Sequence, residues 1–266
     1  MVRERHPDVR VIALTENLGF GSALNRAITE VPGDPILLVN NDVVCGPGFV
    51  AAMIAATEGG ASMVAGVLLH RDDERRIDTA GIVAERDTLM AFDYLHAEDV
   101  SVLAQAAPPL GPSGGAALFS RDAFLEVGGF DERIFLYYED LDLSLRLRHA
   151  GHDCALATEA RGRHAFSATL GFRSGAKYAR SGWSRAYLMN RYGVMDRPGP
   201  AMRAVLAEAI VSAGQLVRDR TLRGGGGRLA GWRATRKVDR LPIPDEGLIE
   251  MPFSERLKLR SSRNRS

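Results

Sequence analysis

Three carboxylates stand within four residues of this sequence, at Glu139, Asp140 and Asp142. The aromatic segment Phe135-Leu136-Tyr137-Tyr138 precedes them and would bury part of the group. Crowding and burial raise the pKa of a carboxyl group, which suits a general base. A structural alternative is that an acidic residue caps the helix that follows and that Arg146 pairs with Asp142. We therefore expect Asp140 to be the functional carboxylate and Asp142 to have a structural role.

A second polar group, Asn40-Asn41-Asp42, follows a short apolar segment. A carboxylate beside amide side chains can hold Mg²⁺ or Mn²⁺ through oxygen and leave room for phosphate. His164 could complete such a site, because imidazole also binds Mn²⁺. The alternatives stay open at this point: the first segment can be a turn that caps the next helix, and a lone histidine is often a surface residue.

Ser113-Gly114-Gly115 precedes another apolar segment. Glycine lacks a Cβ, so this backbone can approach a ligand closely. On its own, the segment predicts only a tight turn.

The elements that would position these residues alternate along the chain. Strands are expected at 9–14, 36–39, 62–69 and 116–120, and helices at 20–30, 47–57, 122–127 and 139–150. Residues 70–110 are weakly patterned and are expected to form a loop-rich excursion over the site. The alternation predicts an α/β fold with a mainly parallel, Rossmann-like sheet, with its ligands at the carboxyl ends of the strands.

The pattern changes near residue 198. An apolar stripe at helical spacing comprises Met202, Val205, Leu206, Ala209, Ile210, Ala213, Leu216 and Val217. Gly224-Gly225-Gly226-Gly227 is expected to be a flexible break. Residues 201–266 carry 14 Lys and Arg against 7 Asp and Glu, a net charge of +7, which leaves −6 for residues 1–200. The stripe either packs on the preceding domain or, with the basic tail, contacts an anionic membrane. The alternative for the tail is a solvated, partly disordered segment.

The composition places the chain among ordinary globular proteins, with 45% hydrophobic and 25% charged residues among 266. No apolar run approaches the roughly 20 residues that cross a bilayer. The first ten residues are charged and lack the apolar centre of a secretion signal. Two cysteines form neither a disulfide framework nor a metal-binding pair. We expect a cytoplasmic protein with no nucleic-acid partner.

Taken in order, the blocks resemble family 2 glycosyltransferases with the GT-A fold, especially the bacterial rhamnosyltransferase-like branch. The resemblance covers roughly residues 8–192. Its blocks are Glu16-Asn17-Leu18-Gly19-Phe20-Gly21 with Asn25, Asn40-Asn41-Asp42, Ser113-Gly114-Gly115-Ala116-Ala117, Val127-Gly128-Gly129-Phe130-Asp131-Glu132, and Tyr138-Glu139-Asp140-Leu141-Asp142-Leu143 with Arg146, Gly151 and His164.

The resemblance implies an inverting sugar transfer from a nucleotide-diphosphate sugar, UDP- or dTDP-linked, to a saccharide or lipid-linked acceptor in surface polysaccharide or glycolipid synthesis. By resemblance, Asp140 is the catalytic base, and Asp42 and His164 bind Mg²⁺ or Mn²⁺. Donor binding is implied for Asn17, Asn40, Asn41 and Asp42, and the acceptor and sugar loop for Ser113, Gly114, Gly115 and Glu139.

The resemblance also implies the domain organisation. Residues 1–195 correspond to a GT-A domain that lacks the strands with which family members begin, and 196–266 to a helical, basic extension. A sheet edge exposed in this way favours a homodimer. It also leaves an alternative function, that of a non-catalytic relative without the nucleotide-binding unit.

Overall fold

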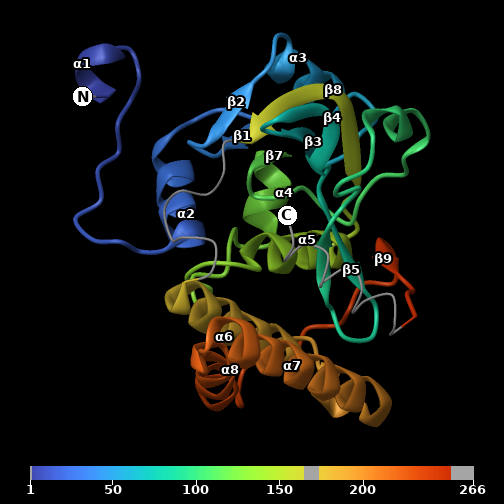
Figure 1. Ribbon diagram of the computed structural model, residues 1–266. Helices are drawn as coiled ribbons and strands as arrows, with labels where there is room; N and C mark the ends of the chain where they lie inside the picture. Colours follow the sequence, from blue (N-terminus) through green and yellow to red (C-terminus); the bar gives the residue numbers. More distant parts are fainter. Residues whose placement is uncertain (1, 165–173, 253–266) are drawn as a thin grey trace.

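The computed structural model describes residues 2–164 and 174–252, and its centre is a six-stranded mixed sheet (Figure 1). The strand order is β1-β7-β3-β8-β2, and β4 also pairs with β3. The bounds are Ile36–Val39 for β1, Val43–Cys45 for β2, Met63–His70 for β3, Asp73–Thr79 for β4, Ala116–Phe119 for β7 and Cys154–His164 for β8. The apolar residues of β3 are buried on both faces, as its central place requires.

The expected α/β class is confirmed, but the expectation of a mainly parallel sheet is wrong. Only β3 and β8 pair in parallel in this sheet, whereas β7 runs antiparallel to both of its neighbours, β1 and β3. The chain enters β7 from the long excursion after β3 and not from a helical crossover, so nothing forces β7 into the direction of its neighbours.

Most of the elements that carry the motifs lie where the sequence predicts them. Helix α2 spans Phe20–Glu30, α4 Arg121–Glu126 and α5 Glu139–His149. Helix α3 (Phe49–Ala55) begins after Gly48, slightly later than expected. A short helix, α1, occupies Val2–Arg5.

The strand expected at residues 9–14 does not form. Val9 is 54% exposed, and β1 bonds to β7 on one side only. Within residues 2–164 and 174–252 no strand lies beyond β1, so the segment has no partner to pair with. Because this edge of β1 is open, a homodimer that pairs through it stays a proposal.

The region 70–110 contains more structure than expected. Besides β4 it contains β5 (Ile82–Glu85), β6 (Ala91–Asp93) and a 3₁₀ helix, η1 (Val100–Gln105). β5 pairs with β6 and also with β9 (Leu248–Ile249), which forms a second small sheet. The sequence does not show the alternation of a strand at residues 71–76, because these charged residues lie on an exposed hairpin that projects from the sheet.

Helix α5 lies between two apolar clusters and is therefore held on two sides. Leu143 and Leu147 pack with Phe124 and Phe130 under the main sheet. Leu141 and Leu145 pack with α6 (Gly175–Arg191) and the second sheet. This burial fixes the direction in which the first turn of α5 presents its acidic residues.

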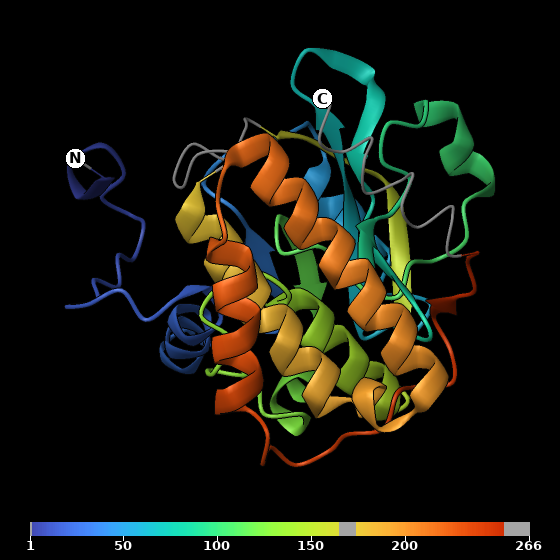
Figure 2. The same cartoon turned by 60° about the horizontal axis from the view of Figure 1, so that its bottom comes forward.

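The expected flexible break at 224–227 is instead the start of helix α8 (Arg223–Ala234), which packs on α6 (Figure 2). A Cβ added at Gly227 would lie 2.0 Å from the carbonyl oxygen of Ala179, and one at Gly231 would lie 2.5 Å from that of Trp183. The glycines therefore serve close helix packing and not flexibility.

Helix α7 (Pro198–Asp219) turns its apolar stripe to the solvent, so the expectation that the stripe packs on the preceding domain is wrong. Its buried face instead contains Ala204, Ala207 and Glu208. The small alanines allow close approach, and the buried Glu208 carboxylate pairs with Arg185 at 2.9 Å and Arg228 at 2.5 Å. A short 3₁₀ helix, η2 (Val194–Asp196), joins α6 to α7. No helix of the described part of the chain is both long and apolar enough to cross a bilayer.

Candidate active site

The loop before α5 has an unusual backbone. Tyr137 and Tyr138 have φ values of 70° and 71°, a left-handed conformation that costs energy in residues with a Cβ. Helix α6 holds this loop: the Ser184 hydroxyl donates to the Leu136 carbonyl at 3.2 Å, and the Arg180 guanidinium lies 4.2 Å from the centre of the Phe135 ring. The strained turn ends where Glu139 and Asp140 begin the helix.

Asp140 contacts the glycine loop directly. The backbone N–H of Gly114 donates to Asp140 Oδ2 at 3.2 Å, and that of Leu141 donates to Oδ1 at 2.8 Å. Burial raises the pKa of Asp140, and the charge of Asp93 adds to this, while the two backbone donors lower it in part. The carboxyl group is therefore a stronger proton acceptor than an ordinary aspartate.

Glu139 and Ser113 lie beside Asp140 with polar atoms that have no partner among the described residues, Glu139 Oε2 and Ser113 Oγ. Burial, and then the charge of Asp140, raise the pKa of Glu139 to about 8. The Gly115 carbonyl accepts from the Asn40 N–H at 3.2 Å, which joins this loop to the end of β1. The predicted acceptor loop, Asp140 and the Asn40 segment are thus brought together, and their roles stay predictions.

Asp42 and His164 meet because of strand register. β2 pairs with the far end of β8, so that Val43 lies opposite His164. His164 Nε2 is 3.4 Å from Asp42 Oδ2, and Asp42 Oδ1 is buried without a partner in the described residues. An unpaired carboxylate oxygen next to an imidazole nitrogen fits Mg²⁺ or Mn²⁺. Residues 2–164 and 174–252 contain no group of three or more His, Cys, Asp or Glu side chains that could hold a metal ion.

Asp78 is a site residue that the sequence reasoning missed. Its Oδ2 lies 2.8 Å from His164 Nδ1, on the opposite side of the ring from Asp42. The pairing of β3 with β4 shifts between Leu68 and Leu69 at this point, and such a bulge re-aims a side chain. The hydrogen bond to Asp78 raises the pKa of His164, helped by the charges of Asp78 and Asp42 and opposed by burial. Nothing in the local sequence marks Asp78, because its partner is 86 residues away.

Asn17 and Asn41 are exposed, and no hydrogen bond among the described residues joins either of them to Asp140. The Asn17 Oδ1 accepts from the Gly19 N–H at 3.0 Å and thus shapes the turn into α2. That turn does lie against the loop before α5, since the Phe20 N–H donates to the Phe135 carbonyl at 2.9 Å. The donor role of both asparagines rests on the resemblance.

Asn25 joins the block around Gly19 and Gly21 to the block around Phe130, which is distant in the sequence. Its side-chain amide accepts from the N–H of Phe130 and donates to the carbonyl of Phe130, both at 2.9 Å. It therefore fixes the turn at Gly128 and Gly129 on α2, and its role is structural.

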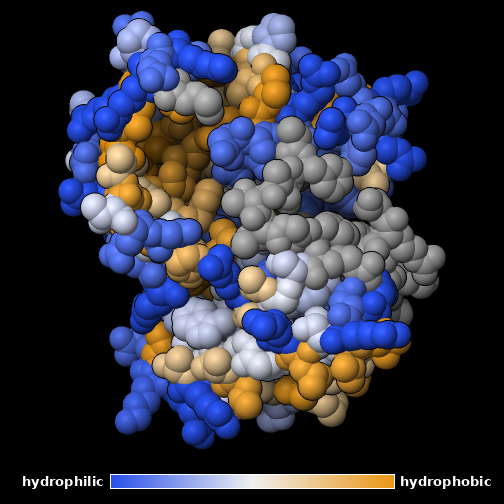
Figure 3. All heavy atoms as spheres, turned by 60° about the vertical axis from the view of Figure 1, so that its left-hand side comes forward, coloured by the Kyte–Doolittle hydropathy of each residue, from blue (hydrophilic) through white to orange (hydrophobic). Residues whose placement is uncertain are grey.

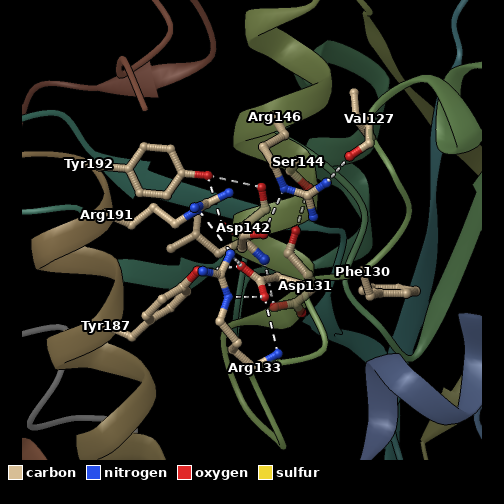
Figure 4. Close-up of polar contacts among 12 residues, drawn as sticks. Val127, Phe130, Asp131, Arg133, Asp142, Ser144, Arg146, Tyr187, Arg191 and Tyr192 are labelled. Atoms are coloured by element: carbon tan, nitrogen blue, oxygen red, sulfur yellow. Dashed lines mark hydrogen bonds and ion pairs between the residues drawn. The ribbon is translucent and has the colours of Figure 1, made fainter. Parts of the chain in front are cut away.

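Asp142 is structural, as expected. Figure 4 shows it facing Arg146 and Tyr192. The Arg146 Nε donates to Asp142 Oδ2 at 2.8 Å and the Tyr192 hydroxyl donates to Oδ1 at 3.0 Å. Arg146 Nη1 also donates to the Val127 carbonyl at 2.7 Å. Asp142 is thus committed to packing α5 on its neighbours, whereas Asp140 is free of any cation among the contacts of the described residues.

Comparisons with known proteins agree with these motifs. The N-acetylglucosaminyl-diphospho-decaprenol L-rhamnosyltransferase of Mycobacterium tuberculosis is 33% identical over 171 residues, which are 56% of this chain and 56% of that protein. The chain thus spans about half the length of these curated relatives. The structure of GalNAc-T7 with UDP, GalNAc and Mn²⁺ matches with a TM-score of 0.51 at 10% identity, over 72% of this chain and 38% of the other, which supports the GT-A fold.

The family model described as "Glycosyltransferase like family 2" matches residues 1–181, which contain every block discussed above. By this match, and by the motifs placed around Asp140, the chain belongs to glycosyltransferase family 2.

Proposed function

We propose that the protein transfers a sugar from a nucleotide-diphosphate sugar to an acceptor hydroxyl with inversion, and that Asp140 is the base. The observation that carries the proposal is the Asp140 carboxylate itself. It has a raised pKa and is oriented by the Gly114 N–H, and its chain neighbour Glu139 and the Gly114 neighbour Ser113 each have a buried polar atom without a partner among the described residues.

In the proposed reaction, Asp140 takes the proton of the acceptor hydroxyl as its oxygen attacks the anomeric carbon. The bond from that carbon to the diphosphate oxygen breaks on the opposite face, which inverts the configuration. The N–H groups of Gly114 and Leu141 keep the carboxylate in place, and Ser113 Oγ and Glu139 Oε2 are available to hydroxyls of the sugar or acceptor.

Asp42 and His164 would hold Mg²⁺ or Mn²⁺ beside the donor, and Asn40 and Asn41 would line it. When bound, such a cation neutralises negative charge on the departing diphosphate. Asp78 keeps the His164 ring turned so that Nε2 faces Asp42.

The M. tuberculosis relative is named for L-rhamnose transfer to a decaprenol-linked acceptor. We accordingly propose a UDP- or dTDP-linked donor, with a deoxyhexose such as rhamnose as the first candidate sugar, and a saccharide or lipid-linked acceptor in cell-surface polysaccharide or glycolipid synthesis. Residues 1–195 would perform the reaction, and 196–266 would form an extension at the inner face of the plasma membrane.

A second candidate is a non-catalytic relative that binds without turnover. The observation in its favour is the open edge of β1, where residues 9–14 have no strand to pair with in the described part of the chain.

Calorimetric titration with UDP- and dTDP-sugars, with and without Mn²⁺, tests the donor site. We expect metal-dependent binding that Asp42→Ala abolishes. Asp72→Ala is the control, because its side chain is 77% exposed and lies on the β3–β4 turn. Binding of no donor would contradict the proposed donor site.

Asp140→Asn then tests the assignment of the base. Donor binding should persist, while the turnover number should fall about 100- to 10,000-fold. Full activity of this variant would remove Asp140 from the role, and donor binding by the wild type without any transfer or hydrolysis would favour the non-catalytic alternative.

A further inference from the structure

The exposed face of α7 is apolar over the whole length of the helix. Val217 is 82% exposed and Met202 70%, and Leu206 and Val205 are about half exposed. Figure 3 shows hydrophobic residues gathered along the lower part of the molecule, where Figure 1 places α6, α7 and α8. Isolated exposed hydrophobic residues are normal, whereas a continuous stripe on one helix marks a contact surface.

The exposed charges of α7, α8 and the residues just after α8 are mostly positive. Between residues 199 and 238 the acidic residues are Glu208, which is buried and paired with two arginines, and Asp219, which accepts from the Tyr178 hydroxyl at 2.8 Å. The basic residues of the same stretch include a group with exposed side chains, namely Arg218, Arg220, Arg223, Arg233, Arg236 and Lys237. We refer to α7 and α8 with these exposed side chains as the α7–α8 surface.

This surface is close in structure to the catalytic loop. Figure 2 shows α7 and α8 on the outside of the molecule with α6 behind them. The opposite side of α6 contacts the loop before Asp140 through Ser184 and Arg180. Helix α6 therefore lies between α8 and that loop.

We propose that the α7–α8 surface docks on an anionic lipid bilayer, with α7 lying in the plane of the interface. An apolar stripe with exposed arginines at the C-terminal end of α7 and on α8 matches acyl chains below a layer of negative headgroups. A second copy of the chain fits less well, because a symmetric contact would bring the same arginines together. Docking would hold the catalytic loop near the headgroups, where a lipid-linked acceptor of the proposed function presents its sugar. The docking itself can be measured without any sugar transfer.

Vesicle co-sedimentation tests this with vesicles of phosphatidylcholine alone and of phosphatidylcholine mixed with phosphatidylglycerol. We expect binding to the anionic vesicles that falls as salt rises. Leu206→Glu should weaken it on the order of tenfold, because it replaces a leucine that docking would bury in the bilayer and adds a negative charge. Leu125→Glu on α4 is the matched control, since Leu125 is 52% exposed and Leu206 51%. Thermal unfolding of both variants verifies that they fold.

Equal weakening by both variants, or binding independent of lipid charge, would overturn the proposal. So would absence of vesicle binding together with a dimer in light scattering that Leu206→Glu dissociates, which would assign the surface to a second copy. Donor titration of the same variants separates the two proposals, because Leu206→Glu should bind the nucleotide sugar as the wild type does.

Discussion

Asp140 and Asp142 stand two positions apart on α5, and their surroundings give them different chemistry. Asp142 is fully buried and paired with Arg146. Among the described residues, the Asp140 carboxylate accepts hydrogen bonds from backbone N–H groups, and burial raises its pKa. The pairing of Asp142 with Arg146 was predictable from the sequence, because a helix places Arg146 one turn from Asp142. The role of Asp140 as the base stays a prediction.

The pair Glu139 and Asp140 should make stability depend on pH. The raised pKa of Glu139 means that the folded protein keeps this proton at a pH at which the unfolded chain has lost it. The stabilisation is complete below the unfolded pKa, about 4.3, and is lost as the pH rises through the folded value of about 8.

Glu139→Gln should therefore be more stable than the wild type at pH 8 by at least about 1 kcal/mol, with little difference at pH 4. Urea unfolding across this range measures it. Parallel pH profiles for the two proteins would show that Glu139 does not titrate as described.

The hydrogen bond from Asp78 to His164 should tune the metal affinity. Asp78→Ala is expected to weaken Mn²⁺ binding in the presence of UDP about 10- to 100-fold, because the imidazole loses the partner that orients it. Asp78→Asn should recover part of the affinity. Electron paramagnetic resonance of free Mn²⁺ measures this, with Asp72→Ala as the control, and an unchanged affinity in Asp78→Ala would exclude a positioning role.

At the scale of elements, glycines decide how α8 packs on α6. Four consecutive glycines predict flexibility from the sequence, but in the structure they form the first part of α8, where Gly227 packs closely on α6. Helix propensity alone disfavours this segment, so its helical state depends on the packing partner.

Gly227→Ala should destabilise the fold by about 1–3 kcal/mol, since its Cβ would lie 2.0 Å from the Ala179 carbonyl oxygen. Gly226→Ala is the matched control: its Cβ meets no described atom within 4 Å. That change should instead stabilise the helix by about 0.5–1 kcal/mol. Urea unfolding of both variants measures the contrast, and equal effects would mean that α8 does not pack in this register.

At the scale of the whole molecule, Glu208 connects α6, α7 and α8 through a buried ion cluster. Its partners Arg185 and Arg228 come from the two neighbouring helices, and Arg185 also donates to the Leu89 carbonyl at 2.8 Å. The cluster thereby connects the C-terminal helices to the turn between β5 and β6.

Removing the Glu208 charge should cost about 3–5 kcal/mol, because it leaves buried arginines unpaired. Glu208→Gln is the test variant, measured by urea unfolding. Glu159→Gln is the control, since Glu159 is 78% exposed and lies 3.4 Å from Arg161. That surface pair should change stability by no more than about 1 kcal/mol, and similar losses in both variants would contradict the role of the cluster.

The sequence by itself determined the elements with a local signal. Helix α2, strand β1 and the first turn of α5 follow from hydrophobic period and from acidic residues beside aromatic ones, all within one or two turns of chain. The blocks around Asn25, Asp42 and Asp140 were sufficient to indicate the family.

Only the tertiary structure decided how distant segments meet. Four features depend on partners far along the chain. They are the bulge at Asp78, the pairing of the end of β8 with β2, the antiparallel direction of β7 and the outward face of α7. Periodicity tells which side of a helix is apolar, but not whether that side is covered. The buried ion pairs of Glu208 with two arginines hold the Glu208 face of α7 against the protein. The apolar stripe lies on the other face of the helix and therefore faces the solvent.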